Sequence, residues 1–266
     1  VLEDIARAQG FREVAFQYEP IAAALHYEQG IVCEELVLIV DIGGGTSDFS
    51  IVRVSPERAR AADRAADILA NDGIRVGGTD FDRLLSLAEV MPLLGYKATT
   101  RGGQGLMPNH YYLDLATWHR INAVYTQRTL IDLKALRAEA DLPELIDRMM
   151  KVVSGRHGHA LAMAVEAAKI ALSDQDFARL NLSAFSGGPN PMVSREKFEQ
   201  AVAAPVQRIA DRIAAVLAQA GLQADQIGTV FMTGGSSGLP VLRTYVGAAL
   251  PGVAIATGDM LGSVGT

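Results

Sequence analysis

The chain has 266 residues, which is enough to bury a full hydrophobic core in one or two domains. A hydrophobic content of 49% beside 20% charged residues is typical of a folded globular protein and speaks against disorder. The net charge of −6, without a basic stripe, speaks against nucleic acid as a partner, and no apolar run reaches the roughly 18 residues of a membrane span. Cys33 is the single cysteine, which excludes an intrachain disulfide and fits a reducing compartment, so we expect a cytoplasmic protein.

The first part of the chain predicts two helices and a group of strands. VLEDIARAQG predicts an amphipathic helix rather than a signal peptide, and because it lacks Met and starts within a helix we expect the chain to be a fragment. Residues 12–18 predict a short strand, which leads into a helix that ends at Gly30. The segments ELVLIVDI, SDFSIVRV and ADILANDGIRVGG predict three strands in an antiparallel meander.

The middle of the chain predicts an insertion. Thr79 caps a helix, and we expect Asp80 and Asp82 to start this helix rather than to act as a catalytic pair. From about 83 to 158 the sequence becomes loop-like and then helical, with polar helices around 128–153.

Regular patterns return in the last part of the chain. We expect a helix at 160–174, a strand at 178–185 and a long helix at 194–219. IGTVFMTGG, GLPVLRTYVGAAL and GVAIATG then predict a strand, a helix and a strand in a βαβ unit.

The sequence DIGGGTSDF, residues 41–49, places three glycines between two carboxylates at the end of a buried strand. A turn without Cβ atoms lets backbone N–H groups approach a phosphate closely. Thr46 adds a hydroxyl for a phosphate oxygen or an attacking water, and Asp41 and Asp48 suit a hydrated magnesium ion. The alternative is a hairpin turn that needs glycine only for positive φ angles.

A second small-residue turn supports the phosphate interpretation. TVFMTGGSSGLP, residues 229–240, predicts a strand, a glycine pair and a helix that Pro240 opens. A helix N-terminus beside small residues suits the phosphate or sugar of a nucleotide, although a plain strand-to-helix turn remains the alternative.

Five segments in order carry a resemblance to a known family: EPIAAALHY, VDIGGGTSDFSI, ILANDGIRVGGTDFD, VEAAKIALS and TVFMTGGSSGLPVLR. They resemble the nucleotide-binding domain of the DnaK-type heat-shock protein 70 chaperones, within the actin-like ATPase superfamily. The segment DLATWH at 114–119 and the enlarged insertion resemble the divergent YegD-like branch most closely. The resemblance implies ATP or ADP and Mg²⁺ as cofactors, and unfolded-protein clients or co-chaperones as partners.

The resemblance also implies roles for individual residues. Glu19, Asp41 and Thr46 would be the catalytic residues, with Glu19 ordering the magnesium and its waters, Asp41 near the metal and the nucleophilic water, and Thr46 on the γ-phosphate. The β- and γ-phosphates would lie in the turn formed by Gly43, Gly44 and Gly45, with Asp48 as the outer carboxylate. The adenosine would contact Glu166, Lys169, Ser173, Gly234, Gly235 and Ser236, and Asp259 is a weaker match for the metal site.

The chain also departs from the family pattern. The first phosphate loop and the catalytic lysine precede anything found here, so we expect the chain alone to be inactive. Two arginines that sandwich the adenine in the family are replaced by Ile170 and Gly238, which predicts ATP binding in the micromolar range or weaker.

Several other features have ordinary explanations. Glu166 and Lys169 at helical spacing could be a surface ion pair, and His157 and His159 are expected to lie in a solvated loop. The glycine-rich segment 101–105 joins no strand to a helix. The small core of the insertion is expected to contain Tyr111, Tyr112, Leu115 and Trp118.

Together these features predict an α/β, actin-like (ribonuclease H-like) ATPase lobe with a mixed sheet and an inserted α+β subdomain. The expected division is 1–33 as the end of a first lobe, 34–82 with 194–266 as the core of a second lobe, and 83–193 as the inserted subdomain. The expected function is a slowly hydrolysing chaperone-type ATP switch. A non-catalytic nucleotide-sensing module and a metabolite kinase of the same superfamily remain alternatives.

Overall fold

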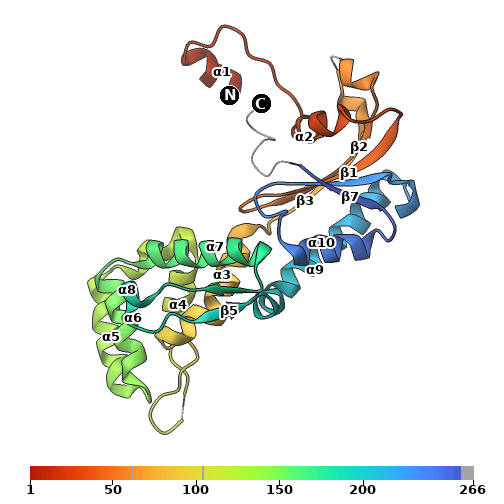
Figure 1. Cartoon of the computed structure of the whole chain (residues 1–266). Helices are drawn as coiled ribbons and strands as arrows, with labels where there is room; N and C mark the ends of the chain where they lie inside the picture. The colour runs from red at the N-terminus through yellow and green to blue at the C-terminus, as the bar shows by residue number, and fades with distance from the viewer. Residues whose placement is uncertain (62, 104, 259–266) are drawn as a thin grey trace.

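The computed structural model describes residues 1–61, 63–103 and 105–258. A five-stranded mixed sheet lies toward one end of the molecule and a group of helices toward the other (Figure 1). The strand order in the sheet is β3-β2-β1-β6-β7. Its strands are β1 (Glu35–Ile42), β2 (Ser47–Val54), β3 (Ile68–Ile74), β6 (Thr229–Thr233) and β7 (Ala254–Thr257).

The pairing confirms the predicted meander and the predicted βαβ unit. β1 pairs antiparallel with β2, and β2 pairs antiparallel with β3. β1 also pairs in parallel with β6, which is followed by α10 (Pro240–Ala249) and by the parallel strand β7. In this register Asp41 lies opposite Thr233, so the carboxyl ends of β1 and β6 meet at one edge of the sheet.

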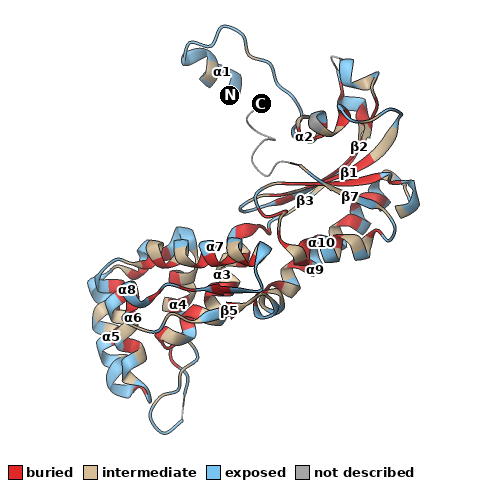
Figure 2. Cartoon of the chain, in the orientation of Figure 1, coloured by how far each residue is buried: buried red, intermediate tan, exposed pale blue. Residues whose placement is uncertain are grey.

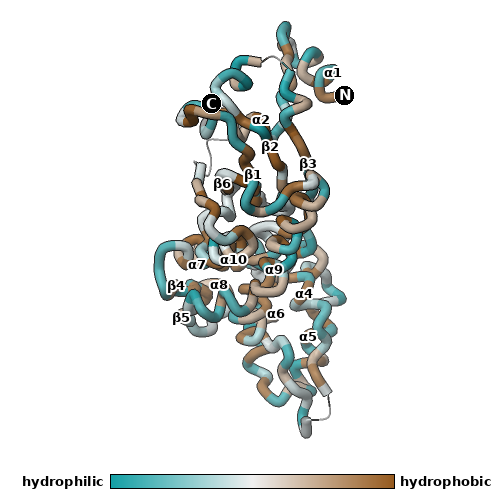
Figure 3. The backbone as a smooth tube through the Cα atoms, turned by 90° about the vertical axis from the view of Figure 1, so that its right-hand side faces the viewer, coloured by the Kyte–Doolittle hydropathy of each residue, from teal (hydrophilic) through white to brown (hydrophobic). Residues whose placement is uncertain are grey.

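Both faces of the sheet are covered, which explains why β1 is apolar from Leu36 to Val40. Val37 and Ile39 of β1 pack on one face with Ile21 of α2 (Glu19–Glu28). Leu38 and Val40 point to the other face, where α9 (Arg195–Ala220) and α10 cover the sheet. The centre of the sheet is accordingly buried in Figure 2, and β1 carries apolar residues in Figure 3.

The helical part follows β3 and returns to the sheet through α9. Its first elements are α3 (Gly78–Leu85), η3 (Ser86–Val90), η4 (Met91–Leu94), α4 (His110–Ala116) and η5 (Trp118–Val124). They are followed by α5 (Gln127–Glu139), α6 (Pro143–Ser154), α7 (Gly158–Asp174), β4 (Phe177–Arg179), α8 (Ser183–Ser186) and β5 (Met192–Ser194). The hairpin of β4 and β5 makes this part α+β.

The remaining described elements are short. They are α1 (Leu2–Ala8), in which no residue is buried, and the 3-10 turns η1 (Arg58–Arg60), η2 (Ala65–Asp67) and η6 (Ala224–Gln226). Within the described ranges, no helix has the length and apolar character to cross a membrane. The mixed α/β fold class agrees with the expectation from the sequence, whereas the three-part division of the chain stays a prediction.

Three local predictions are wrong. Residues 12–18 form no strand, because they lie against no sheet edge and nearly all of them are exposed. The strand expected at 178–185 ends at Arg179, since the Asn190 Oδ1 accepts hydrogen bonds from the amides of Leu182 and Ser183 and the chain turns into α8. Trp118 is 50% exposed and is therefore no core residue, although Tyr112 and Leu115 are buried as expected.

Candidate functional site

Three loops meet at the carboxyl ends of β1 and β6. The first is the glycine turn after β1, the second joins β3 to α3, and the third follows β6. The amide of Gly78 donates to the Gly43 carbonyl (2.9 Å), and the amide of Thr79 donates to the Gly44 carbonyl (2.8 Å). The amide of Ser236 donates to the Ile42 carbonyl (3.1 Å). The end of a sheet at which such loops converge is where open α/β folds bind ligands.

Two of these loops need glycine because other backbone comes so close. A Cβ atom at Gly77 would lie 2.7 Å from the Gly43 carbonyl oxygen and from Gly44. Gly234 has a φ of +84°, and a Cβ atom there would meet Asp41 and Ile42. Side chains at these two positions would force the three loops apart.

In the turn after β1, by contrast, the glycines are not crowded by other backbone. Gly44 and Gly45 have no atom within 4 Å of the place where a Cβ would stand, and both are exposed. None of Gly43, Gly44 and Gly45 has a positive φ, so the hairpin alternative does not account for them. The amide of Gly43 donates to the Thr46 carbonyl (2.9 Å) and closes the turn. In the described part of the chain, the amides of Gly44 and Gly45 donate to no protein acceptor, so they are free for an anion.

Carboxylates gather beside this turn. Glu19 of α2 lines a pocket of about 60 Å³ together with Asp41 and Asp48, which flank the turn. Burial raises the pKa of the Asp41 carboxyl, and the charges of Glu19 and Asp48 raise it further. The hydroxyl of Thr46 donates to Asp48 Oδ2 (3.1 Å). A cation at this place would offset the mutual repulsion of the three carboxylates.

The geometry suits a hydrated cation better than a directly ligated one. Among residues 1–61, 63–103 and 105–258, no group of three histidine, cysteine, aspartate or glutamate side chains is close enough to hold a metal ion. Magnesium keeps several of its waters when one or two carboxylates and a phosphate bind it. Glu19 and Asp41 therefore fit a magnesium ion that is held through water.

The residues predicted to contact the adenosine lie on α7 and in the turn after β6. Glu166 is exposed, Ser173 is half-buried, and Ile170 is 60% exposed. Gly235 is exposed, whereas Ser236 is buried against the loop of Gly78. The predicted weak metal site residue Asp259 lies outside the described residues.

Lys169 does not form the surface ion pair with Glu166 that the sequence suggested. Its ammonium donates to Asp82 Oδ2 (2.9 Å) and to the Gly78 carbonyl (3.4 Å), and only 9% of its side chain is exposed. Burial raises the pKa of the Asp82 carboxyl, although the Lys169 ammonium opposes this shift. Lys169 therefore joins α7 to α3 rather than pairing with Glu166.

Sequence reasoning missed Gly77, Gly78 and Asp82 as parts of this site. Asp80 lies in the first turn of α3, as predicted, and accepts a hydrogen bond from the Gly77 amide (3.0 Å). The predicted cap at Thr79 is wrong, because the N-cap is Gly77 and Thr79 lies inside the helix. Asp82, however, faces α7. The sequence signal for these residues is the glycine pair Gly77 and Gly78 after β3, because glycines at the end of a strand often mark a close approach of two backbones.

The other features singled out from the sequence lie outside this site. His157 and His159 lie at the start of α7 and are half-buried, against Phe185 and Trp118 respectively, so the prediction of a solvated loop is wrong. Gly102 and Gly103 have positive φ angles in an exposed turn.

Known proteins resemble the chain over most of its length. The family described as "Hsp70 protein" matches residues 149–251. The chaperone proteins HscA of Shigella boydii serotype 18 and of an Escherichia coli O17 strain are each 28% identical over 246 residues. These alignments cover 92% of this chain but only 29% of each relative's length. The chain is therefore similar to the Hsp70 family over residues 149–251 and to these chaperone proteins over most of its length.

Proposed function

We propose that the chain is the nucleotide-binding part of a chaperone-type ATP switch that hydrolyses ATP slowly. The observation that carries the proposal is the open turn at Gly44 and Gly45, which lies beside the carboxylates of Glu19, Asp41 and Asp48. A donor-lined turn next to an acidic pocket suits a polyphosphate together with its cation.

The phosphate end of the nucleotide would lie on this turn. The amides of Gly44 and Gly45 would donate to phosphate oxygens, and the backbone contacts of Gly77 and Gly78 would hold the turn in place. The hydroxyl of Thr46 would leave Asp48 for a phosphate oxygen or for the attacking water. A bound Mg²⁺ would neutralise phosphate charge, and Asp41 would orient the water for in-line attack.

The nucleoside end would extend toward α7. Glu166 and Ser173 would contact the ribose and base from α7, and Gly234, Gly235 and Ser236 would lie beneath them. Lys169 is already held by Asp82 and Gly78, so it would contact the ribose from a fixed position.

Finer parts of the proposal concern the subfamily, the cellular location and the partners. The YegD-like branch is supported by residues 114–119 and by the enlarged insertion. We also propose a cytoplasmic location, which the single cysteine favours, and contacts with unfolded clients or co-chaperones, because the HscA relatives are named chaperone proteins. The whole protein's activity is part of this proposal because the chain spans a minor share of these relatives.

A non-catalytic nucleotide sensor is the second candidate. It is favoured by Ile170 and Gly238, which stand where the family has two adenine-stacking arginines. Such a module would bind nucleotide weakly and would not turn it over.

Calorimetric titration of the 266-residue chain with MgATP and MgADP tests the proposed site. The Gly44→Val variant should fold, because no atom lies within 4 Å of a Cβ there, but it should lose nucleotide binding. Gly30→Val is the matched control, since Gly30 is also uncrowded and follows α2. Unchanged binding by Gly44→Val would refute the site, and equal loss in both variants would show that the effect is not specific.

A further inference from the structure

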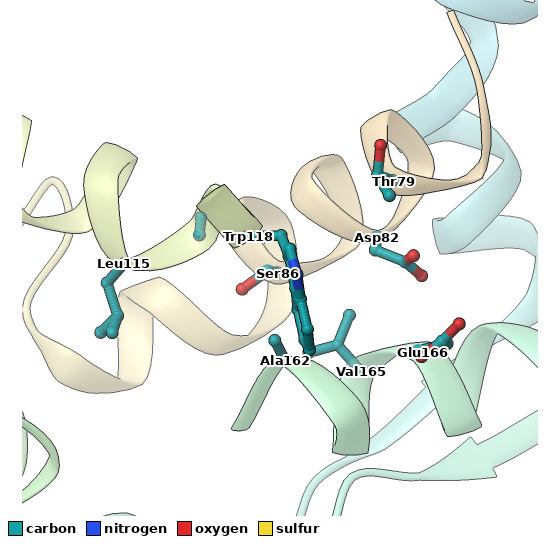
Figure 4. Close-up of a pocket in the computed structure, with 9 residues that line it drawn as sticks. Thr79, Asp82, Ser86, Leu115, Trp118, Ala162, Val165 and Glu166 are labelled. Carbon is teal, nitrogen blue, oxygen red and sulfur yellow. The ribbon is translucent and has the colours of Figure 1, made fainter. Parts of the chain in front are cut away.

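A second cavity lies in the helical part of the molecule and borders the glycine loops at Thr79, whose hydroxyl donates to the Gly44 carbonyl (2.8 Å). It has a volume of about 200 Å³ and lies between α3, η3, α4, η5 and α7 (Figure 4). Its apolar wall is formed by Leu115, Trp118, Ala162 and Val165. We call this cavity the Trp118 pocket.

Trp118 gives the pocket an aromatic face. Its indole is 50% exposed although it stands next to a buried helix bundle. The ring of His159 meets the indole edge-on, with 5.0 Å between the ring centroids and an interplanar angle of 89°, which fixes its orientation. An indole held in this way offers a surface on which a flat ring can stack.

The same pocket contains two buried polar atoms without a partner. Within the described residues, Asp82 Oδ1 and Ser86 Oγ are inaccessible to solvent and make no hydrogen bond to the protein. Ser86 as a whole is only 4% exposed. Buried polar atoms are nearly always hydrogen-bonded, so two orphans lining one pocket indicate a missing hydrogen-bonding group.

The charges in the pocket determine what that group would be. Lys169 pairs with Asp82 Oδ2 and offsets its charge, whereas Glu166 lines the pocket and has no such partner among the residues that the structure describes. Figure 4 shows the carboxylates of Asp82 and Glu166 on the same side of the indole. The pocket therefore has an acceptor-rich, net negative side opposite an aromatic wall.

We propose that the Trp118 pocket binds a small planar cation, namely an aromatic ring that carries amidinium or amino groups. The ring stacks on Trp118, and the N–H groups donate to Asp82 Oδ1 and Ser86 Oγ. Glu166 supplies the opposing charge. Such donors supply the partners that the two orphaned oxygens lack.

This site goes beyond the proposed nucleotide site. Ser173, which would contact the base, and Ala162, which lines the pocket, are eleven residues apart on α7, or about 16 Å along the helix axis. The two sites share Glu166 and Asp82 among the residues named for each. The test below uses no nucleotide, so its outcome is independent of the proposed function.

Trp118 also provides the measurement, because it is the only tryptophan in the chain. We expect benzamidinium to quench or shift the tryptophan fluorescence in a saturable manner. Benzoate has the same ring with a negative charge, and benzyl alcohol has it with none, so both should bind at least about tenfold more weakly. Equal binding of benzoate, or no saturable change with benzamidinium, would overturn the proposal.

Two variants test whether the ligand binds in the Trp118 pocket. Ser86→Ala removes an unpartnered hydroxyl, so it should leave the melting temperature unchanged or higher and weaken benzamidinium binding about threefold or more. Trp118→Leu, measured by ligand-observed NMR, should weaken it about tenfold, in line with the loss of aromatic stacking. His119→Leu is the matched control, since His119 is exposed beside Trp118 but does not line the pocket. Full affinity in both Ser86→Ala and Trp118→Leu, or an equal loss in His119→Leu, would contradict the assignment.

Discussion

The ammonium of Lys169 lies 2.9 Å from Asp82 Oδ2 and joins α7 to α3 across the space between the glycine loops and the Trp118 pocket. Both side chains are largely buried, with 9% of Lys169 and 19% of Asp82 exposed. Removal of one partner from a buried ion pair leaves the other charge uncompensated, which destabilises more than removal of both.

The first prediction concerns this pair. Asp82→Ala and Lys169→Ala should each lower the free energy of unfolding by about 2–4 kcal/mol, and the double variant should lose less than the sum. Urea denaturation in a double-mutant cycle measures the coupling. The exposed i,i+4 pair of Arg128 and Asp132 is the control and should show a coupling of about 0.5 kcal/mol or less. Equal couplings in the two cycles would show that Lys169 and Asp82 do not act as a buried pair.

The second prediction separates the two uses of glycine at the site. Gly77→Ala places a Cβ 2.7 Å from the Gly43 and Gly44 backbone and should destabilise the chain by about 1–3 kcal/mol. Gly77 has an extended backbone with a φ of −160°, so the expected loss is steric rather than conformational.

Gly44→Ala is the matched comparison. Its Cβ would meet no atom within 4 Å, so stability should change by less than about 1 kcal/mol while nucleotide binding falls. Thermal melts and calorimetric titrations of both variants check this. If Gly44→Ala proved as destabilised as Gly77→Ala, the turn would be packed rather than open.

The third prediction concerns Asp41 and pH. Because burial and the neighbouring carboxylates raise the pKa of Asp41 in the folded state, the folded chain binds this proton more tightly than the unfolded chain does. The ionised form therefore costs stability, and that cost grows as the pH rises through the raised pKa. Asp41→Asn should consequently stabilise the chain at pH 7, and the gain should disappear below the model-peptide value of about 3.9.

Urea denaturation between pH 3 and pH 8, on the order of one unit per step, measures this difference. Asp225→Asn is the control because Asp225 is exposed in η6 and does not line the acidic pocket. A stability difference between Asp41→Asn and the parent chain that does not change with pH would contradict the raised pKa.

The fourth prediction concerns the base. Ile170 is 60% exposed on α7, at the position where the resemblance to the DnaK-type chaperones would place a stacking arginine. Ile170→Arg should tighten MgATP binding by about tenfold through stacking on the adenine, and Gly238→Arg should act in the same direction. Ile131→Arg is the control, because Ile131 is also 60% exposed but lies on α5. Equal effects at 131 and 170 would indicate a general charge effect instead of stacking.

The strands of the sheet could be predicted because each carries its own signal. β1 is apolar from Leu36 to Val40, half of the residues of β2 are apolar, and glycines follow both β1 and β6. The segment 12–18 has similar β propensity and yet forms no strand, because a strand also needs a partner that local sequence does not specify.

The candidate site could be predicted only where its residues are close together in the sequence. The glycine turn and its carboxylates are contiguous in sequence, and their pattern is informative. The Asp82–Lys169 pair joins residues 87 positions apart, and it forms only because α3 packs on α7. The Trp118 pocket likewise depends on five elements that meet through packing, so the sequence alone suggested a core position for Trp118.

The most direct test of the central claim is a titration of the ¹⁵N-labelled chain with MgATP, followed by the amide resonances. The account predicts that the amide resonances of Gly44, Gly45 and Thr46 shift most, while the amide resonance of Gly30 keeps its chemical shift. Shifts that leave Gly44 and Gly45 unchanged would contradict a phosphate site at this turn.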